Sequence, residues 1–460
     1  MKLKGSLHHS LDVRKVTVAS PEVYSYGAML IGGILRERGY GVKVVRGWEG
    51  LEGEVVGLSL TSLSHLREAA RLVPALKKGG KKVVIGGPIT QVPELVLRSL
   101  PEVDAVVVGE GEETAPEVFG VLLERGELEG VEGVAFLREG EEVKTPPRRP
   151  PDLSGRPLPE IPSDVWRQDI RGAQVYLETH RGCLGGCGFC QVPCFFGRRV
   201  RSRPPEEIEK EVKAFMEKGV RRISFFGGTS THYGRDGEGD FIDLLERVSK
   251  LLGPKNVSVP DLRVDEVDRE VLEALKRYTI GFLIFGIESG STRMLRKMRK
   301  GITVEQIWEG VEKAREVGLE VGGAFIVGYP GETEEDYLET KEMVEELMLD
   351  EYTISLADPL PGTPLAEEVC RLPEEENPVF QKEEGKWGRL GLTVAEARAL
   401  DLMLTASCAR SRPILLTDGF YHRLVEEVKK QGEEVRANTR DLKRLLGFSG
   451  TVFREKSRRK

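Results

Sequence analysis

The sequence predicts an α/β protein with three parts: an amino-terminal doubly wound Rossmann-like domain, a central partial (β/α)6 barrel and a mostly helical carboxyl-terminal region. Short β-branched runs alternate with amphipathic stretches over residues 12–145 and again over residues 172–356, which predicts the first two parts. The proline-rich segment 146–162 separates them. With 460 residues, of which 39% are hydrophobic and 31% charged, the chain is long enough for about three domains of roughly 150 residues each.

The first domain, residues 1–145, is predicted to contain a parallel sheet. Continuous apolar strands separated by helices are typical of sheets that are covered on both faces. The predicted strands are residues 13–19, 42–45, 55–60, 82–85 and 105–108. The predicted helices are residues 28–38, 66–77 and 114–125, and a hairpin at 133–143 closes the unit.

Seven prolines lie within residues 146–162, and they predict a stiff linker over 146–171, because proline continues neither a helix nor a sheet.

The second domain, residues 172–358, then repeats a strand–helix unit six times. Its predicted strands are residues 174–179, 222–226, 257–259, 282–286, 320–327 and 351–356. Its predicted helices are residues 205–218, 240–251, 268–277, 304–316 and 334–346. Six units are two short of a full barrel, and such barrels carry their sites at the carboxyl ends of the strands.

The last part, residues 359–460, is expected to be mostly helical, ending in a basic, solvated tail at 454–460.

Composition narrows the class of protein further. A net charge of −7 offers no broad electrostatic surface for nucleic acid. We expect neither a membrane span nor a secretory leader, and therefore a cytoplasmic protein, because no run of 18 apolar residues occurs. Only three asparagines beside many charged residues favour a hot-growing host.

The cysteines carry the clearest chemical signal. None occurs in the first 182 residues, and four of the six lie within twelve positions: Cys183, Cys187, Cys190 and Cys194. A disulfide framework would spread its cysteines along the chain, so this group is predicted to be a local ligand cluster. Glycines between the cysteines let the backbone turn toward the sulfurs. Structural zinc is the alternative, with Cys194 or His180 as the fourth ligand.

The spacing C-x3-C-x2-C directly after the first strand of the second domain resembles the radical SAM superfamily, and the aromatic Phe189 before the last cysteine matches it too. The resemblance implies that Cys183, Cys187 and Cys190 bind three irons of a [4Fe-4S] cluster and leave the fourth iron open for S-adenosylmethionine (SAM). Cys194 would then be a bystander or lie near the active site.

Further segments at predicted strand ends are similar to the SAM-binding motifs of that superfamily. The segment 225–229 resembles the one that receives the SAM amino group, although Thr229 replaces the usual glutamate. The segments 286–290 and 325–333 resemble the ribose-side and adenine-side motifs, with Glu288 as the hydroxyl acceptor. The resemblance therefore implies these SAM-binding residues: Phe189, Gly227, Gly228, Thr229, Glu288, Ser289 and Ile326.

Small and hydroxyl residues follow three neighbouring strands of the first domain, where they are predicted to form a crevice for a large flat ligand. No G-x-G-x-x-G follows the first strand, which disfavours a dinucleotide. Before a radical SAM domain, this pattern resembles the cobalamin-binding domain of the cobalamin-dependent radical SAM enzymes. The residues implied to line the cobalamin site are Ser59, Thr61, Ser62, Gly86, Gly87, Pro88, Gly109, Glu110 and Glu112. The Asp-x-His-x-x-Gly motif is missing after strand one, so cobalt is expected to lack a histidine ligand.

The combined resemblance implies a radical SAM methyltransferase with a [4Fe-4S] cluster, SAM and cobalamin as cofactors. Reductive cleavage of SAM yields a 5′-deoxyadenosyl radical that takes hydrogen from an unactivated carbon, methylcobalamin supplies the methyl group, and a second SAM restores it. Ferredoxin or flavodoxin is the implied type of electron donor. The substrate class is left open between a protein or peptide and a small molecule. If the host is a hot-growing methanogen, the domain order resembles that of the methyltransferases that modify methyl-coenzyme M reductase, including the glutamine C-methyltransferase. No residue identifies the substrate or a catalytic side chain.

Two alternatives to the methyltransferase function stay open, and a third is disfavoured. A cobalamin radical enzyme that oxidises or cyclises a small molecule would use the same cofactors. A corrinoid carrier protein would use the metal for stability alone. A methylthiotransferase is disfavoured, because it needs a second cysteine triad in its amino-terminal domain, where this chain has no cysteine.

Overall fold

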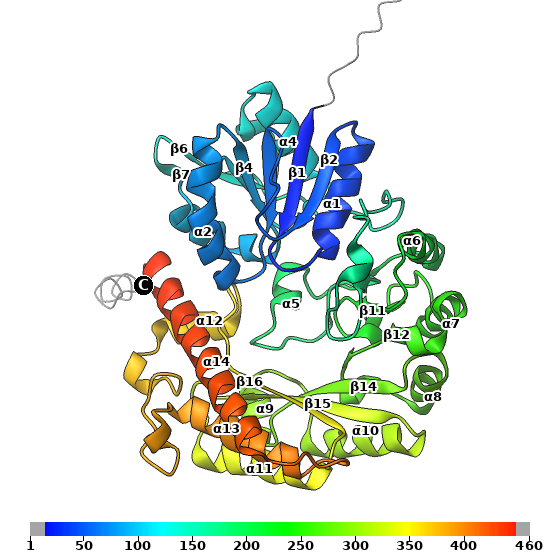
Figure 1. Ribbon diagram of the computed structural model, residues 1–460, viewed down its shortest axis with the longest axis vertical. Helices are drawn as coiled ribbons and strands as arrows, with labels where there is room; N and C mark the ends of the chain where they lie inside the picture. The colour runs from blue at the N-terminus through cyan, green and yellow to red at the C-terminus, as the bar shows by residue number, and fades with distance from the viewer. Residues whose placement is uncertain (1–13, 448–460) are drawn as a thin grey trace, which may run out of the picture.

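The computed structural model describes residues 14–447, which form the three predicted parts (Figure 1). The basic tail predicted at 454–460 lies outside the described residues. In the described part of the chain, no helix is both long enough and apolar enough to cross a membrane.

The amino-terminal domain has a seven-stranded sheet with the order β2-β1-β3-β4-β5-β6-β7. The first five strands are parallel, and the last two form an antiparallel hairpin at the edge. The strands are β1 (Lys15–Ser20), β2 (Gly41–Arg46), β3 (Val55–Ser59), β4 (Lys82–Gly86), β5 (Ala105–Val107), β6 (Val134–Arg138) and β7 (Glu141–Lys144). The helices are α1 (Tyr26–Glu37), α2 (Leu63–Lys78), α3 (Pro93–Ser99) and α4 (Thr114–Glu124).

Helices cover both faces of this sheet, as the continuous apolar strands predict. Helices α1 and α4 bury their apolar residues against one face and α2 and α3 against the other. The carboxyl ends of the strands face the barrel (Figure 1). The doubly wound architecture is therefore confirmed, with α3 as a helix that the pattern did not predict.

The proline-rich segment between the domains is packed rather than free. Leu153, Ile161 and Val165 are buried, and the backbone N–H of Glu160 donates to Met29 O in α1 at 2.8 Å. The short helix η3 (Val165–Arg167) is its one helical turn. The segment therefore fixes the first domain against the second instead of separating them as a spacer.

The central domain is a partial barrel whose strands form two parallel sheets, β12-β11-β8 and β13-β14-β15-β16. The predicted strand at 257–259 corresponds to β12, and a second short strand, β13, which was not predicted, follows Pro260. Proline has no N–H to continue the ladder between the two strands. The strands are β8 (Val175–Glu178), β11 (Ile223–Phe226), β12 (Val257–Ser258), β13 (Asp261–Leu262), β14 (Phe282–Glu288), β15 (Glu320–Val327) and β16 (Glu351–Leu356). The helices are α6 (Pro205–Glu217), α7 (Phe241–Leu252), α8 (Arg269–Tyr278), α9 (Thr292–Lys297), α10 (Val304–Glu316) and α11 (Glu334–Leu347).

The carboxyl-terminal region is helical and touches both other domains. It contains α12 (Pro364–Arg371), α13 (Val394–Cys408) and the long α14 (Asp418–Leu445). Helix α14 runs from α13 and β16 of the barrel up to α2 and α3 of the first domain (Figure 1). Its Leu442 and Leu445 are buried in the same apolar cluster as α2 and α3. Asn438 bonds both Arg67 of the first domain and Asp358 after β16.

Candidate active site

The cysteine loop starts where the first barrel strand ends. After β8, the short strand β9 (His180–Arg181) pairs antiparallel with β10 (Arg201–Ser202), and this ladder closes the base of a loop that contains all the clustered cysteines. Gly182 has φ +89°, and a side-chain carbon there would lie 2.1 Å from Arg199 O. Only glycine fits this turn, so the loop is held tightly at its base.

The thiols of Cys183, Cys187 and Cys190 lie near enough for their charges to act on one another. A side-chain carbon at Gly185 would lie 3.3 Å from Cys183 Sγ and 3.9 Å from Cys187 Sγ. Burial, together with the charges of Cys187 and Cys183, raises the pKa of Cys190 to about 12. Iron bound to the thiolates would remove this cost. Three half-buried sulfur donors on one glycine-rich loop fit a [4Fe-4S] cluster with three cysteine ligands.

Two residues, His180 and Cys194, are the candidates for a fourth zinc ligand. His180 Nε2 accepts from the Gly228 N–H at 3.1 Å, and its Nδ1 lies 2.9 Å from Thr179 Oγ1. Burial raises the pKa of the Cys194 thiol, and interaction with the Gln91 side chain opposes that rise. Within residues 14–447, no group of three or more His, Cys, Asp or Glu side chains, the loop cysteines included, is drawn together around one point. The engaged ring of His180 disfavours a zinc site with that histidine as its fourth ligand.

Two buried cations, which the sequence pattern did not reveal, stand beside the thiols. Arg263 Nη1 donates to Lys300 O at 3.0 Å, and Lys300 Nζ forms an ion pair with Glu288 Oε1 at 2.8 Å. Burial raises the pKa of Cys187, and the charges of Lys300 and Arg263 oppose that rise. The pair supplies positive charge where thiolates and a bound anion need it. A spacing motif cannot show this, because the two residues come from different loops.

The glycines predicted to receive the SAM amino group follow β11 directly. A side-chain carbon at Gly227 would lie 2.5 Å from the His180 ring, and one at Gly228 would lie 2.5 Å from Gly182 O. Thr229 is buried and precedes the short helix η4 (Ser230–His232). Both glycines are therefore needed to pack this strand end against the cysteine loop, and their contact with SAM stays a prediction.

The predicted ribose-side residues Glu288 and Ser289 lie at the carboxyl end of β14, and the predicted adenine-side residue Ile326 lies in β15. Glu288 ends β14 in the left-handed region, φ +70°, where Lys300 holds its carboxylate. The fully buried Ser289 hydroxyl lies 2.9 Å from Thr340 Oγ1 and accepts from the Ser291 N–H. It stabilises the turn after β14, and a contact of Ser289 with SAM stays a prediction. Phe189 and Ile326 pack against one apolar cluster: Met294, Met298, Tyr329, Ala357, Leu365 and Val369.

In the first domain, the predicted cobalamin residues lie at the strand ends that face the barrel. Ser62 caps α2, since its Oγ accepts from the His65 N–H at 3.3 Å, and Thr61 Oγ1 lies 3.0 Å from His65 Nδ1. Gly87 has φ +91°, and a side-chain carbon there would lie 2.5 Å from Leu60 O. By contrast, positions 59, 61, 86 and 109 are not fully buried, and side-chain carbons at 86 and 109 would meet nothing within 4 Å. This open edge is compatible with a flat ligand.

The two predicted cofactor regions are in direct contact. The helix α5 (Gln191–Phe195), which starts at the third cluster cysteine, packs against η1 (Pro88–Gln91), which follows the Gly86–Gly87 turn. Gln191 Nε2 donates to Pro88 O at 3.3 Å. Figure 1 shows α5 directly below the first sheet. The cysteine loop and the cobalamin edge thus form one site between the domains.

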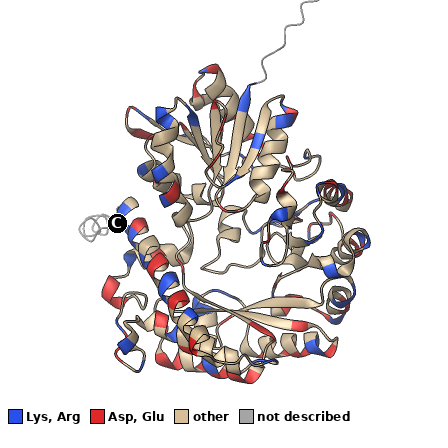
Figure 2. Ribbon diagram, in the orientation of Figure 1, with Lys and Arg blue, Asp and Glu red and all other residues tan. Residues whose placement is uncertain are grey.

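The carboxylates of Glu110 and Glu112, two of the residues predicted to border the corrin, are buried in ion pairs with Arg181, and each has a further arginine partner. The contact of residues 109–112 with a corrin stays a prediction. Elsewhere, charges of both signs lie mainly along the outer helices and loops (Figure 2).

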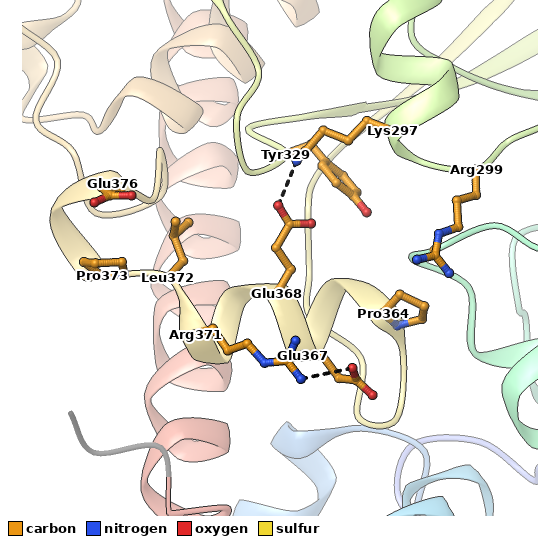
Figure 3. Close-up of a pocket in the computed structure, with 11 residues that line it drawn as sticks. Lys297, Arg299, Tyr329, Pro364, Glu367, Glu368, Arg371, Leu372, Pro373 and Glu376 are labelled. Carbon is orange, nitrogen blue, oxygen red and sulfur yellow. Dashed lines mark hydrogen bonds and ion pairs between the residues drawn. The ribbon is translucent and has the colours of Figure 1, made fainter. Parts of the chain in front are cut away.

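A separate cavity of about 460 Å³ lies behind the cysteine loop, with Gly188 as the shared wall. Figure 3 shows its charged lining, in which Lys297 pairs with Glu368 at 2.8 Å and Arg371 with Glu367 at 3.6 Å. Its lining includes Tyr329, from the predicted adenine-side segment 325–333, so the cavity borders the predicted cofactor region.

Comparison with known proteins agrees with this geometry. Residues 177–344 match the family model of the radical SAM superfamily, and residues 15–119 match that of the B12 binding domain. The chain therefore belongs to the radical SAM superfamily and has the domains of its cobalamin-dependent enzymes.

Particular relatives and structures refine that class. The chain is 45% identical to a Methanocaldococcus jannaschii protein provisionally named a methylthiotransferase, over 92% of this chain and 95% of that one. It is 33% identical to an uncharacterized methyltransferase of Pyrococcus horikoshii, over 68% of this chain and 69% of that one. It shares the fold of the radical SAM methyltransferase TsrM of Kitasatospora setae, solved with cobalamin and a [4Fe-4S] cluster bound, with a TM-score of 0.65, 17% identity and coverage of 93% and 89%.

Proposed function

We propose that this protein is a C-methyltransferase that places a methyl group on an unactivated carbon of an amino-acid residue in a protein, such as a glutamine of a protein like methyl-coenzyme M reductase. The observation that carries the methyl-transfer part is the direct packing of α5 against η1, because it puts the cluster loop beside the cobalamin edge. Adjacent sites are what a reaction needs when a radical and a methyl group must reach one substrate carbon.

The residues of the chain divide the work. Cys183, Cys187 and Cys190 would hold the cluster, and Lys300 and Arg263 stabilise negative charge beside it. When bound, the cluster, SAM and cobalamin together supply the radical and the methyl group that no side chain can provide. The protein positions these groups and excludes water by closing the first domain over the strand ends of the barrel.

Methylthio transfer is a second candidate, favoured by the name of the Methanocaldococcus jannaschii relative. Residues 1–182 contain no cysteine, so the chain lacks the second cysteine triad that such a reaction needs. Methyl transfer therefore has the stronger support.

Product analysis separates the candidates. Anaerobic, reduced protein loaded with all three cofactors should convert a candidate peptide to a product heavier by one CH2 unit, with S-adenosylhomocysteine and 5′-deoxyadenosine formed in about equal amounts. A mass gain that includes sulfur would establish methylthio transfer. Formation of 5′-deoxyadenosine without S-adenosylhomocysteine would establish oxidation or cyclisation, and release of neither would indicate a corrinoid carrier.

A further inference from the structure

Both ends of the cysteine loop bond to a single carboxylate of the other domain. Glu110 follows β5 in the first domain, where its side chain is 5% exposed. Its carboxylate accepts from Arg181, just before the loop, and from Arg201, just after it, with Arg201 Nη1 at 3.1 Å from Oε2. Because Arg181 and Arg201 face each other in the β9–β10 ladder, one residue contacts both ends of the segment that carries the cysteines.

The surrounding charges make this contact costly to open. Glu112 and Glu178 pair with Arg181 and with Arg156 of the linker, so three arginines balance three carboxylates. The charges of Arg181 and Arg156 outweigh burial and hold the pKa of Glu178 at about 2. A buried pair that loses one partner leaves an uncompensated charge, which is far more destabilising than loss of an exposed pair.

The positions of these residues in the chain show that the contact links the two predicted cofactor regions. Glu110 belongs to the loop that borders the predicted corrin edge, and Arg181 lies two positions before the first cluster cysteine. A shift of the first domain would therefore move both ends of the cysteine loop with it. Packing of α5 on η1 fixes the same loop at a second point.

We propose that Glu110 is a positioning residue that clamps the base of the cysteine loop to the cobalamin-binding domain and so sets the distance between cluster and corrin. This inference rests on the cobalamin-dependent part of the proposed function. It assigns Glu110 no contact with substrate or cofactor.

The test compares Glu110→Gln with Glu117→Gln, a control in the same domain that breaks an ion pair with Arg148 but touches no part of the cysteine loop. In each anaerobic holoprotein, pulsed electron paramagnetic resonance measures the distance between the reduced cluster and cob(II)alamin. Glu110→Gln should shift that distance distribution and broaden it, whereas the control should match the wild type. A loaded Glu110→Gln protein with the wild-type distribution would overturn the proposal.

Hydrogen exchange on cofactor-free protein gives a second reading that does not depend on loading. Amides of residues 182–200 should exchange at least about tenfold faster in Glu110→Gln than in the control. If Glu110→Gln does not fold, Arg201→Gln removes one arm of the clamp and is judged by the same two criteria. A wild-type protein that binds no cobalamin would refute the proposed function. In that case no distance can be measured, and the exchange result decides on the clamp.

Discussion

Replacing Lys300 by methionine should destabilise the barrel strongly, because it strands a buried carboxylate. Lys300 and Glu288 are 6% and 8% exposed, with Nζ and Oε1 2.8 Å apart. Loss of one partner of such a pair costs about 3–5 kcal/mol. At about 2–4 °C per kcal/mol, Tm should fall by roughly 6–20 °C. The space around Lys300 Nζ is tightly filled, because a side-chain carbon at Gly286 would lie only 2.7 Å from that nitrogen. No neighbouring side chain can therefore move in to pair with Glu288.

The loss should also depend on pH in a defined direction. In Lys300→Met, a buried carboxylate has no cation beside it, and burial of an unpaired carboxylate favours its protonated form. The folded variant then binds more protons than the unfolded one, so the Tm difference from wild type should shrink as pH falls from 8 to 5. In the wild type, pairing with Glu288 raises the pKa of Lys300 despite burial. That part of the stability should be lost only above about pH 10.4.

Calorimetry on three variants checks this reasoning. Lys313→Met makes the same change in an exposed pair with Glu309 and should lower Tm by less than about 2 °C. The double variant Glu288→Gln, Lys300→Met should recover much of the loss, because no charge remains buried. If Lys300→Met unfolds no earlier than Lys313→Met, the pair does not carry the stability that its burial implies.

Other outcomes follow from the same structure. A Cys183, Cys187, Cys190 triple alanine variant should fold but bind no iron, whereas Cys194→Ser should keep the full cluster by iron analysis; stoichiometric iron in the triple variant would contradict the ligand assignment. Electron paramagnetic resonance of the cob(II)alamin form should show no nitrogen splitting from a protein histidine. Two SAM should be consumed per methylated product, one to S-adenosylhomocysteine and one to 5′-deoxyadenosine. Hydrogen bonds from Lys341, Tyr337 and Lys386 outweigh burial and lower the pKa of Asp401 to about 2, so Asp401→Asn should lower Tm at pH 7, with the difference lost as pH falls from about 4 to 2.

Local patterns were sufficient for most of the fold. Strand β16 and helix α10 have the predicted bounds. Apolar and polar residues alternate along the strand, and a threonine cap marks the start of the helix. Helix α3 was missed, since Pro93 and only seven residues give no readable period. The break between β12 and β13 depends on Pro260, and a single proline in a short strand does not show from sequence whether the ladder continues or stops.

The site was only partly predictable for a different reason. The three cluster cysteines could be predicted from their spacing within eight residues, because a sequence shows that spacing directly. Glu110 and its partners Arg181 and Arg201 are 71 and 91 positions apart, and a glycine-rich strand end gives no hint that a carboxylate there is already paired. Lys300 and Arg263 were missed because their roles come from folding alone.

The long helix α14 means that the first domain is not complete in its own stretch of sequence. Leu442 and Leu445 belong to its apolar core, and Arg98 donates to Leu445 O at 2.8 Å, so a helix more than 300 positions away in the chain completes that core. A fragment ending near residue 145 would expose part of the core and be prone to aggregation. Cobalamin binding should therefore be studied with α14 present, because the edge that is predicted to bind cobalamin and the helix that covers its domain come from distant parts of the sequence.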